Sequence, residues 1–253
     1  VLGNGNFNYF IVGQKEATLI ECGTSVGVSI FARQWSDLEN KPDIKHILVM
    51  HSHFDHVCGI PMLKDLFPAA QVAASPVTHK MLSHEKLKPI LQRADAFIID
   101  AYNEKQLLPT ISGPLEIDRV KVDFTLGEGD TIIVDDELKL EIIEAPGHSA
   151  CSLAAYLPSD QAMFISDAGG YQAPSGIMSP VFFQDYDIYR DTIKRLRQYP
   201  TEVLGVGHGD VSVGAQQVQQ FYSGALDAAV QAFDLIKEKL NRGQSDESIT
   251  IEL

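Results

Sequence analysis

The sequence has 253 residues, of which 45% are hydrophobic and 21% are charged, and this composition favours one large domain spanning residues 1–253. No apolar run approaches the roughly 18 residues of a membrane span, and the N-terminus lacks the basic and apolar stretches of a secretory signal. The formal net charge of −14 disfavours binding to nucleic acid or to anionic membranes, because both depend on clustered Lys and Arg.

In the first half of the chain, short apolar runs that are typical of strands alternate with segments that have the apolar spacing of a helix. Residues 7–13, 17–21 and 46–50 predict strands, and residues 26–38 have the apolar spacing of a helix. Residues 75–110 read as broken helices inserted between strands. Such an insertion either shapes a pocket or only caps the core, and the pattern leaves both readings open.

The second half repeats the order of strands followed by helices. Five apolar segments predict strands, with "VDDEL" and "PSDQ" as turns: "RVKVDF", "TIIV", "LKLEIIE", "SLAAYL" and "AMFIS". Helices are expected at 184–198 and 214–240, and the second keeps one face apolar. Strands then helices in both halves predict an α/β fold in which two packed sheets have helices on their outer faces.

The segment "HSHFDH", residues 51–56, follows the apolar run "HILVM" and concentrates potential metal ligands. His51 and His53 are two residues apart, so extended backbone directs both imidazoles to one side. Asp55 and His56 fall where the chain turns towards a helix, and they can face a neighbouring point. Imidazole and carboxylate groups are ligands for zinc or iron, so the motif predicts two adjacent metal ions.

Three further candidate ligands follow predicted strands. His148 lies in "APGHSA", Asp167 ends the run "AMFIS", and His208 lies in "VLGVGHGD". Each is next to glycine or another small residue, which allows close approach of the backbone. An isolated histidine is usually an ordinary polar side chain, but the shared position after strands favours metal binding for this set.

The motif HxHxDH, the three later ligands and the upstream "TLIECG" resemble the metallo-beta-lactamase superfamily over residues 7–210. The resemblance implies an αββα sandwich of two mixed sheets with a dinuclear site at one edge. It also implies that His51, His53 and His148 hold one metal, that Asp55, His56 and His208 hold the other, and that Asp167 bridges them. Residues 178–200 are most similar to the glyoxalase II and quinolone-signal response thioesterase branch.

A dinuclear centre of this kind predicts a hydrolase that uses a metal-bound hydroxide on a small thioester, ester or lactone. Asp55 and Asp167 are the expected catalytic carboxylates, and the cofactors are two divalent ions, zinc or iron, with manganese as a further option. The alternative is a non-hydrolytic iron protein of the same fold, either a persulfide dioxygenase or a sensor or regulator. The ligand set alone does not separate these functions.

Four aromatic residues are candidates for the substrate site: Tyr171, Phe182, Phe183 and Tyr186. Tyr171 could donate a hydrogen bond to an oxyanion and the others could form an apolar wall, although core packing is the more common role for such residues. The expected partner is a small-molecule substrate, and a homodimer is left open. Cys22, Cys58 and Cys151 are widely spaced without a CxxC motif, which favours the reducing cytoplasm.

Overall fold

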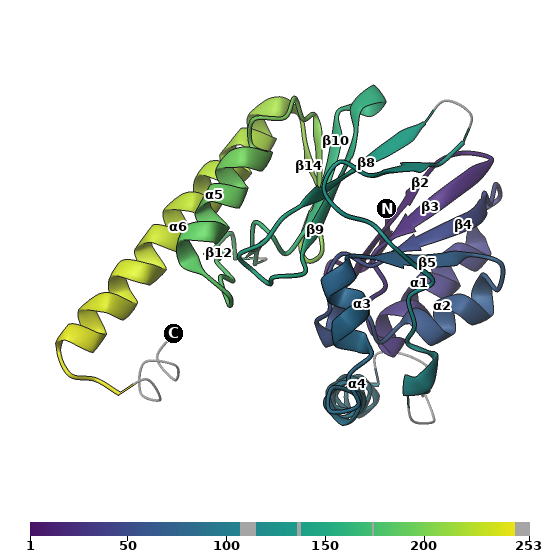
Figure 1. Cartoon of the computed structure of the whole chain (residues 1–253), viewed down its shortest axis with the longest axis horizontal. Helices are drawn as coiled ribbons and strands as arrows, with labels where there is room; N and C mark the ends of the chain where they lie inside the picture. Colours follow the sequence, from purple (N-terminus) through teal and green to yellow (C-terminus); the bar gives the residue numbers. More distant parts are fainter. Residues whose placement is uncertain (107–114, 136–137, 174, 246–253) are drawn as a thin grey trace.

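A computed structural model describes residues 1–106, 115–135, 138–173 and 175–245. Two six-stranded mixed sheets pack against each other, and helices cover their outer faces (Figure 1). The helices are α1 (Ser25–Asp37), α2 (Ile60–Leu66), α3 (Pro76–Leu82), α4 (Lys88–Glu104), α5 (Tyr186–Leu196) and α6 (Ala215–Asn241). In Figure 1, α1 to α4 lie on one side of the sheets and α5 and α6 on the other. The predicted αββα sandwich is therefore confirmed.

The first sheet has the strand order β1-β2-β3-β4-β5-β6. Its strands are β1 (Leu2–Gly3), β2 (Asn8–Val12), β3 (Glu16–Ile20), β4 (Asp43–Leu48), β5 (Gln71–Ala74) and β6 (Phe124–Thr125). The pairs from β3 to β6 are parallel, whereas β2 is antiparallel to both of its neighbours. The carboxyl ends of the parallel strands meet at one edge, so the loops after β3 and β4 lie close together.

The second sheet has the order β14-β13-β10-β9-β8-β7. Its strands are β7 (Thr131–Ile133), β8 (Lys139–Glu144), β9 (Leu153–Leu157), β10 (Ala162–Ser166), β13 (Val203–Val206) and β14 (Ser212–Val213). Only the pair of β10 with β13 is parallel. A small ribbon of β11 (Tyr171–Gln172) and β12 (Met178–Ser179) follows β10.

Alternation along the strands divides the apolar residues into three buried layers. On β3, Leu19 packs towards the helices and Ile20 towards the second sheet. On β9, Ala154 packs beneath α5 and α6, whereas Leu153 lies between the sheets. Because side chains of a strand point alternately to its two faces, runs that are apolar at every position mark strands buried on both faces. The strands of both sheets are thus packed on both faces.

One predicted strand is wrong in its extent. "RVKVDF" was expected to be a strand from residue 119, but a 3₁₀ helix, Ile117–Arg119, takes its start and β6 begins only at Phe124. The carboxylate of Asp123 accepts a hydrogen bond from the backbone N–H of Val72 at 2.8 Å. In a regular ladder, a backbone carbonyl of the paired strand would accept this bond. The backbone N–H of Asp123 still donates to the carbonyl of Val72 at 2.8 Å, so the side chain replaces only one backbone acceptor before β6. The predicted turn "VDDEL" includes positions 136 and 137, which lie outside the described residues.

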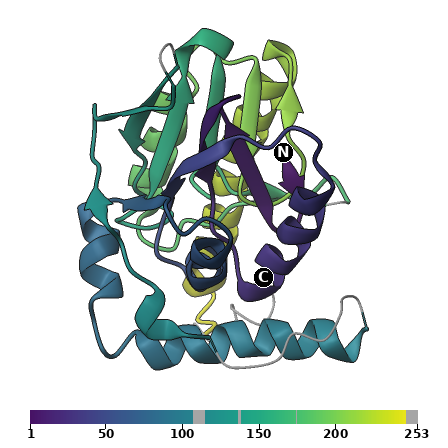
Figure 2. The same ribbon diagram turned by 90° about the vertical axis from the view of Figure 1, so that its right-hand side faces the viewer.

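The predicted insertion at 75–110 contains α3 and α4, and its last residues, 107–110, lie outside the described residues. Figure 2 shows α4 as a long helix that crosses one end of the sandwich. Ser75 caps α3 and also donates to the carbonyl of Cys151 at 2.9 Å, which ties the insertion to the second half of the chain. Within the described ranges, no helix combines the length and apolar character of a membrane span.

Candidate metal centre

The seven predicted ligands all lie in segments that follow strands at one edge of the sandwich, and Asp55 and His56 are in a 3₁₀ helix, Phe54–His56. His51, His53, Asp55 and His56 follow β4, His148 follows β8, Asp167 follows β10 and His208 follows β13. The backbone approaches closely here, because a Cβ atom on Gly207 would lie 2.8 Å from Oδ1 of Asp167. Glycine at this position therefore lets β13 bring His208 up to the carboxylate.

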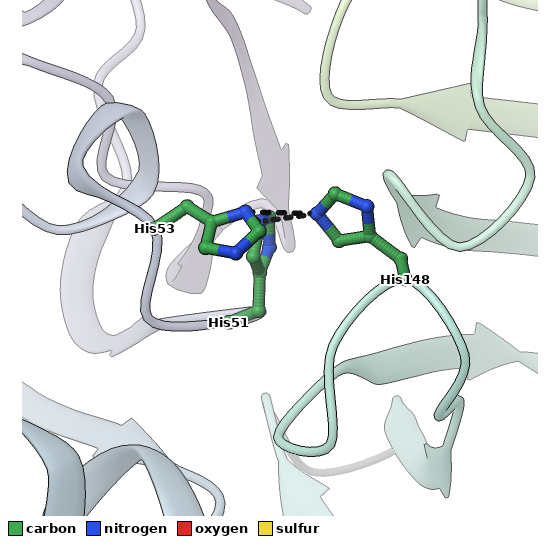
Figure 3. A group of neighbouring side chains, drawn as sticks. All are labelled: His51, His53 and His148. Atoms are coloured by element: carbon green, nitrogen blue, oxygen red, sulfur yellow. Dashed lines mark hydrogen bonds between the residues drawn. The ribbon is translucent and has the colours of Figure 1, made fainter. Parts of the chain in front are cut away.

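The first group of ligands consists of His51, His53 and His148 (Figure 3). Nε2 of His148 lies 3.1 Å from Nε2 of His51 and 2.9 Å from Nδ1 of His53. Nε2 of His51 and Nδ1 of His53 are 3.2 Å apart. Figure 3 shows His51 and His53 facing His148 across the space between the two halves of the molecule.

The second group consists of Asp55, His56 and His208, and a further overlapping group joins His51, His56 and Asp167. Nε2 of His208 lies 3.2 Å from Nε2 of His56 and 3.3 Å from Oδ2 of Asp55. Asp167 lies between the two groups, with Oδ2 3.6 Å from Nε2 of His148 and Oδ1 3.7 Å from Nε2 of His208. One carboxylate thus faces both sets of imidazoles, which is the arrangement expected of a bridging ligand.

Hydrogen bonds on the far side of the rings orient three of the imidazoles. Nδ1 of His148 donates to the carbonyl of Val181 at 2.7 Å, and Nδ1 of His208 donates to the carbonyl of Asn6 at 2.6 Å. Nδ1 of His56 donates to the carboxylate of Glu21 at 2.7 Å. A neutral imidazole that donates from Nδ1 has a lone pair at Nε2, so these bonds direct lone pairs into the site.

Burial and neighbouring charges divide the ionisable groups into two kinds. Burial lowers the pKa of His51 well below its ordinary value, and it lowers the pKa of His53 to about 4, so both rings are neutral at pH 7. Burial opposes ionisation of Asp167, but the imidazole of His56 and its neighbours hold the pKa of this carboxyl well below 3.8. Burial also opposes protonation of His56 and His208, but the carboxylates beside them outweigh it and raise both pKa values, so a bound cation competes with a proton for these two rings.

The donor set fits two divalent cations. The nitrogens of His51, His53 and His148 surround one point, where a cation accepts a lone pair from each, whereas a proton can bridge only two of them. Oδ1 of Asp167 is buried without a hydrogen-bond partner, which is costly unless a cation faces it. The residues therefore suit metal ions better than a network of hydrogen bonds.

A cleft of about 500 Å³ opens beside the ligands. Two of the four predicted substrate residues line it: Tyr171, which is 36% exposed, and Phe183, whose ring centroid lies 5.2 Å from that of His148. Phe182 and Tyr186 do not line it, and they contact each other at 5.4 Å within the core beneath α5 and α6. The backbone N–H of Phe183 donates to the carbonyl of Val181 at 3.0 Å, and this turn about Phe182 separates the two rings.

Glu21 is a further residue of the centre that the sequence pattern did not assign. Its side chain is buried and bonded to His56, and its φ of 79° lies in the left-handed region that non-glycine residues rarely adopt. The sequence signal that pointed to Glu21 was a carboxylate at the end of an apolar strand, because a carboxylate buried there requires a partner. The sequence did not show that His56 supplies this partner.

Comparison with known proteins agrees with the architecture and the ligand pattern. The Metallo-beta-lactamase superfamily model matches residues 3–208. Among curated proteins, the metallo-beta-lactamase fold-containing protein ST1585 of Sulfurisphaera tokodaii is 25% identical over 205 residues, which are 79% of this chain and 71% of that protein. The chain therefore belongs to the metallo-beta-lactamase superfamily.

Solved structures show the same fold at lower identity. The crystal structure of ST1585, an archaeal superfamily protein from Sulfolobus tokodaii, has a TM-score of 0.62 and 20% identity, covering 88% of this chain and 83% of that one. The sec-alkylsulfatase Pisa1 from Pseudomonas sp. has a TM-score of 0.65 and 16% identity, covering 98% of this chain and 42% of that one. At these identities the similarity establishes the fold alone.

Proposed function

We propose that the protein is a dinuclear metal-dependent hydrolase that acts on a small thioester, ester or lactone. The observation that carries this proposal is the convergence of two ligand groups on the carboxylate of Asp167, beside an open cleft. When bound, two divalent ions would lower the pKa of a water molecule and polarise the substrate carbonyl. Zinc, iron and manganese all suit this donor set.

The residues of the chain hold and orient the reactants. The carboxylate of Asp55 lines the cleft, so it can accept a hydrogen bond from the attacking water and later receive its proton. The hydroxyl of Tyr171, which also lines the cleft, can donate to the developing oxyanion. In the net reaction, the acyl carbon gains the oxygen of water and loses its bond to the leaving group, which takes up a proton.

Replacement of Asp167 tests the proposed function. We expect Asp167→Asn to lower kcat/KM for a responsive thioester, ester or lactone by at least about 100-fold, because it removes the charge between the two ligand groups. Circular dichroism and elemental analysis would show whether fold and metal content persist. Asp227→Asn, at an exposed position of α6, is the matched control and should retain parental activity.

The same preparation separates the hydrolase from the iron-protein alternative. A panel of thioesters, esters and lactones would be assayed with zinc-, iron- and manganese-loaded protein, and oxygen consumption would be followed with a persulfide substrate. Hydrolysis that depends on Asp167 supports the proposal. Oxygen consumption without hydrolysis by any metal form would contradict it in favour of the dioxygenase.

A further inference from the structure

Two clefts of different character meet at the metal ligands. The first, the apolar cleft, has a volume of about 500 Å³, and its outer wall comes from α3, α4 and the connection between them. The second, the polar cleft, has a volume of about 510 Å³ and lies between the N-terminal segment and the loop after β13. Both include Asp55, Tyr171 and His208, so a molecule that reaches the ligands can extend into both clefts.

The outer wall of the apolar cleft is formed by side chains without charge. Met81 comes from α3, Leu87 precedes α4, and Ile90, Leu91 and Ala94 lie on successive turns of α4. Ile90 is 52% exposed and Met81 is 38% exposed, so apolar surface on this wall faces solvent until something covers it. Burial of an alkyl chain against such a wall is favourable in proportion to the apolar area removed from water.

The wall of the polar cleft offers neutral hydrogen-bonding groups and one acidic group. Asn4, Asn6 and Gln172 contribute amide side chains, and Asp210 contributes an exposed carboxylate. Among the described residues that line either cleft, there is no lysine or arginine. A substrate with a carboxylate or phosphate in its leaving group would therefore find no cationic side chain in these walls to pair with it.

Taking the proposed hydrolytic function as its basis, we infer that the substrate is an uncharged amphiphile that spans the two clefts. Its apolar acyl chain lies in the apolar cleft, its scissile carbonyl lies at the metal ligands, and its neutral, hydrogen-bonding leaving group lies in the polar cleft. The face of α4 that includes Ala94 sets the length of acyl chain that is accepted, and Asp210 disfavours anionic leaving groups.

Chain length provides a direct binding test. The probes are amide isosteres of S-acyl-N-acetylcysteamine thioesters, with acyl chains from acetyl to decanoyl, and isothermal titration calorimetry would measure their Kd with the metal-loaded protein. We expect Kd to fall by about fourfold for each methylene until the cleft is filled, which corresponds to the free energy of burying one methylene. A Kd that does not change with chain length would overturn the inference.

Two substitutions on α4 localise the acyl chain. Ala94→Phe places a ring in the apolar cleft, whereas Ala96→Phe adds the same ring at an exposed position two residues away that does not line it. We expect Ala94→Phe to lower kcat/KM for the decanoyl thioester by about tenfold relative to the acetyl thioester, and Ala96→Phe to keep the parental ratio. If Ala94→Phe does not fold, Ile90→Phe on the same wall serves as the test variant. Parental ratios in both wall variants would overturn the assignment.

The charge of the leaving group tests the polar cleft. The parent should hydrolyse the neutral octanoyl thioester of N-acetylcysteamine in preference to the anionic octanoyl thioester of 3-mercaptopropionate. Asp210→Lys should reduce this preference by about tenfold, because it replaces a repulsive charge by an attractive one, whereas Asp227→Lys on α6 should not. An equal or larger preference in Asp210→Lys would overturn the role of Asp210.

Failure of the inference and failure of the proposed function give different results. Hydrolysis of thioesters with no dependence on chain length overturns the inference and leaves the hydrolase standing. Amide binding that strengthens with chain length, together with no hydrolysis of any thioester, ester or lactone, overturns the hydrolase and leaves the apolar cleft as a binding site for acyl chains.

Discussion

At the scale of single residues, the contact between Glu21 and His56 shows how a residue that is not itself a predicted ligand orients one. Glu21 accepts from Nδ1 of His56 at 2.7 Å, while its second oxygen, Oε1, is buried without a partner. Burial lowers the pKa of His56, but the carboxylates of Glu21 and Asp167 outweigh it and raise this pKa well above its ordinary value. In the presence of a cation, the same carboxylate increases the basicity of the ligating nitrogen.

Substitution of Glu21 should therefore weaken metal binding without removing a ligand. We expect Glu21→Gln to lower the metal affinity of the second ligand group by about 10- to 100-fold, because the amide keeps the shape of the side chain and loses its charge. Competition with a chromophoric chelator measures this affinity. Glu16→Gln, at an exposed position of β3, the strand that precedes Glu21, is the control, and equal affinities for the two variants would contradict the prediction.

Individual ligands were predictable from sequence to different degrees. The set His51, His53, Asp55 and His56 was accessible because its members fall within six positions directly after a strand, so the geometry of the extended backbone constrains them. The carbonyls of Asn6 and Val181 that orient His208 and His148 were not accessible, because every residue has a carbonyl and only the tertiary fold selects one. The separation of Phe183 from Phe182 likewise depends on the path of one loop.

At the scale of elements, α4 is fixed to the body of the protein by a buried carboxylate. Asp95, in the middle of α4, accepts from the backbone N–H of Ser25 at 2.9 Å and from its hydroxyl at 2.6 Å. Ser25 is the first residue of α1, so the carboxylate also lies at the positive end of that helix. The insertion was predicted as a helical segment, but this attachment to α1 joins residues 70 positions apart, which no local pattern shows.

Loss of this attachment should destabilise the protein. We expect Asp95→Ala to lower the free energy of unfolding by about 1–3 kcal/mol, because the N–H and hydroxyl of Ser25 lose their acceptor in a buried environment. Asp95→Asn should cost less, since the amide can accept from one group and donate to the other. Urea unfolding measures both, with Asp100→Ala at an exposed position of α4 as the control. A parental value for Asp95→Ala would refute the role of the contact.

The same residue gives a pH dependence of defined sign. Burial raises the pKa of Asp95 above its ordinary value of 3.8, so the folded protein binds this proton more readily than the unfolded chain. The contribution of Asp95 to stability is therefore greatest below 3.8 and decreases as the pH rises through the folded pKa. Asp95→Asn lacks this decrease. The free energy of unfolding of Asp95→Asn minus that of the parent should therefore increase between about pH 4 and about pH 7. A constant or decreasing difference would contradict the assignment.

At the scale of the whole molecule, the candidate centre joins the two halves of the sandwich. His51, His53, Asp55 and His56 follow the first sheet, whereas His148, Asp167 and His208 belong to the second. The two-layer architecture was predictable because each half has its own apolar strands and helices. The register that places the halves against each other depends on side chains of the shared core, such as Phe10 against Phe164 at 5.0 Å between ring centroids.

Metal ions should consequently stabilise the folded protein across this junction. We expect about two ions per chain by elemental analysis, after purification or reconstitution with zinc, iron or manganese. A free ion concentration of 100 times Kd adds about 2.7 kcal/mol per site to the free energy of unfolding, so removal of both ions by a chelator should lower Tm by roughly 10–20 °C. Addition of metal should restore it, and Asp167→Ala, which lacks the carboxylate shared by both ligand groups, should show a smaller shift. Protein that binds no transition metal after reconstitution, with a Tm indifferent to chelator, would exclude a metal centre at this edge of the sandwich.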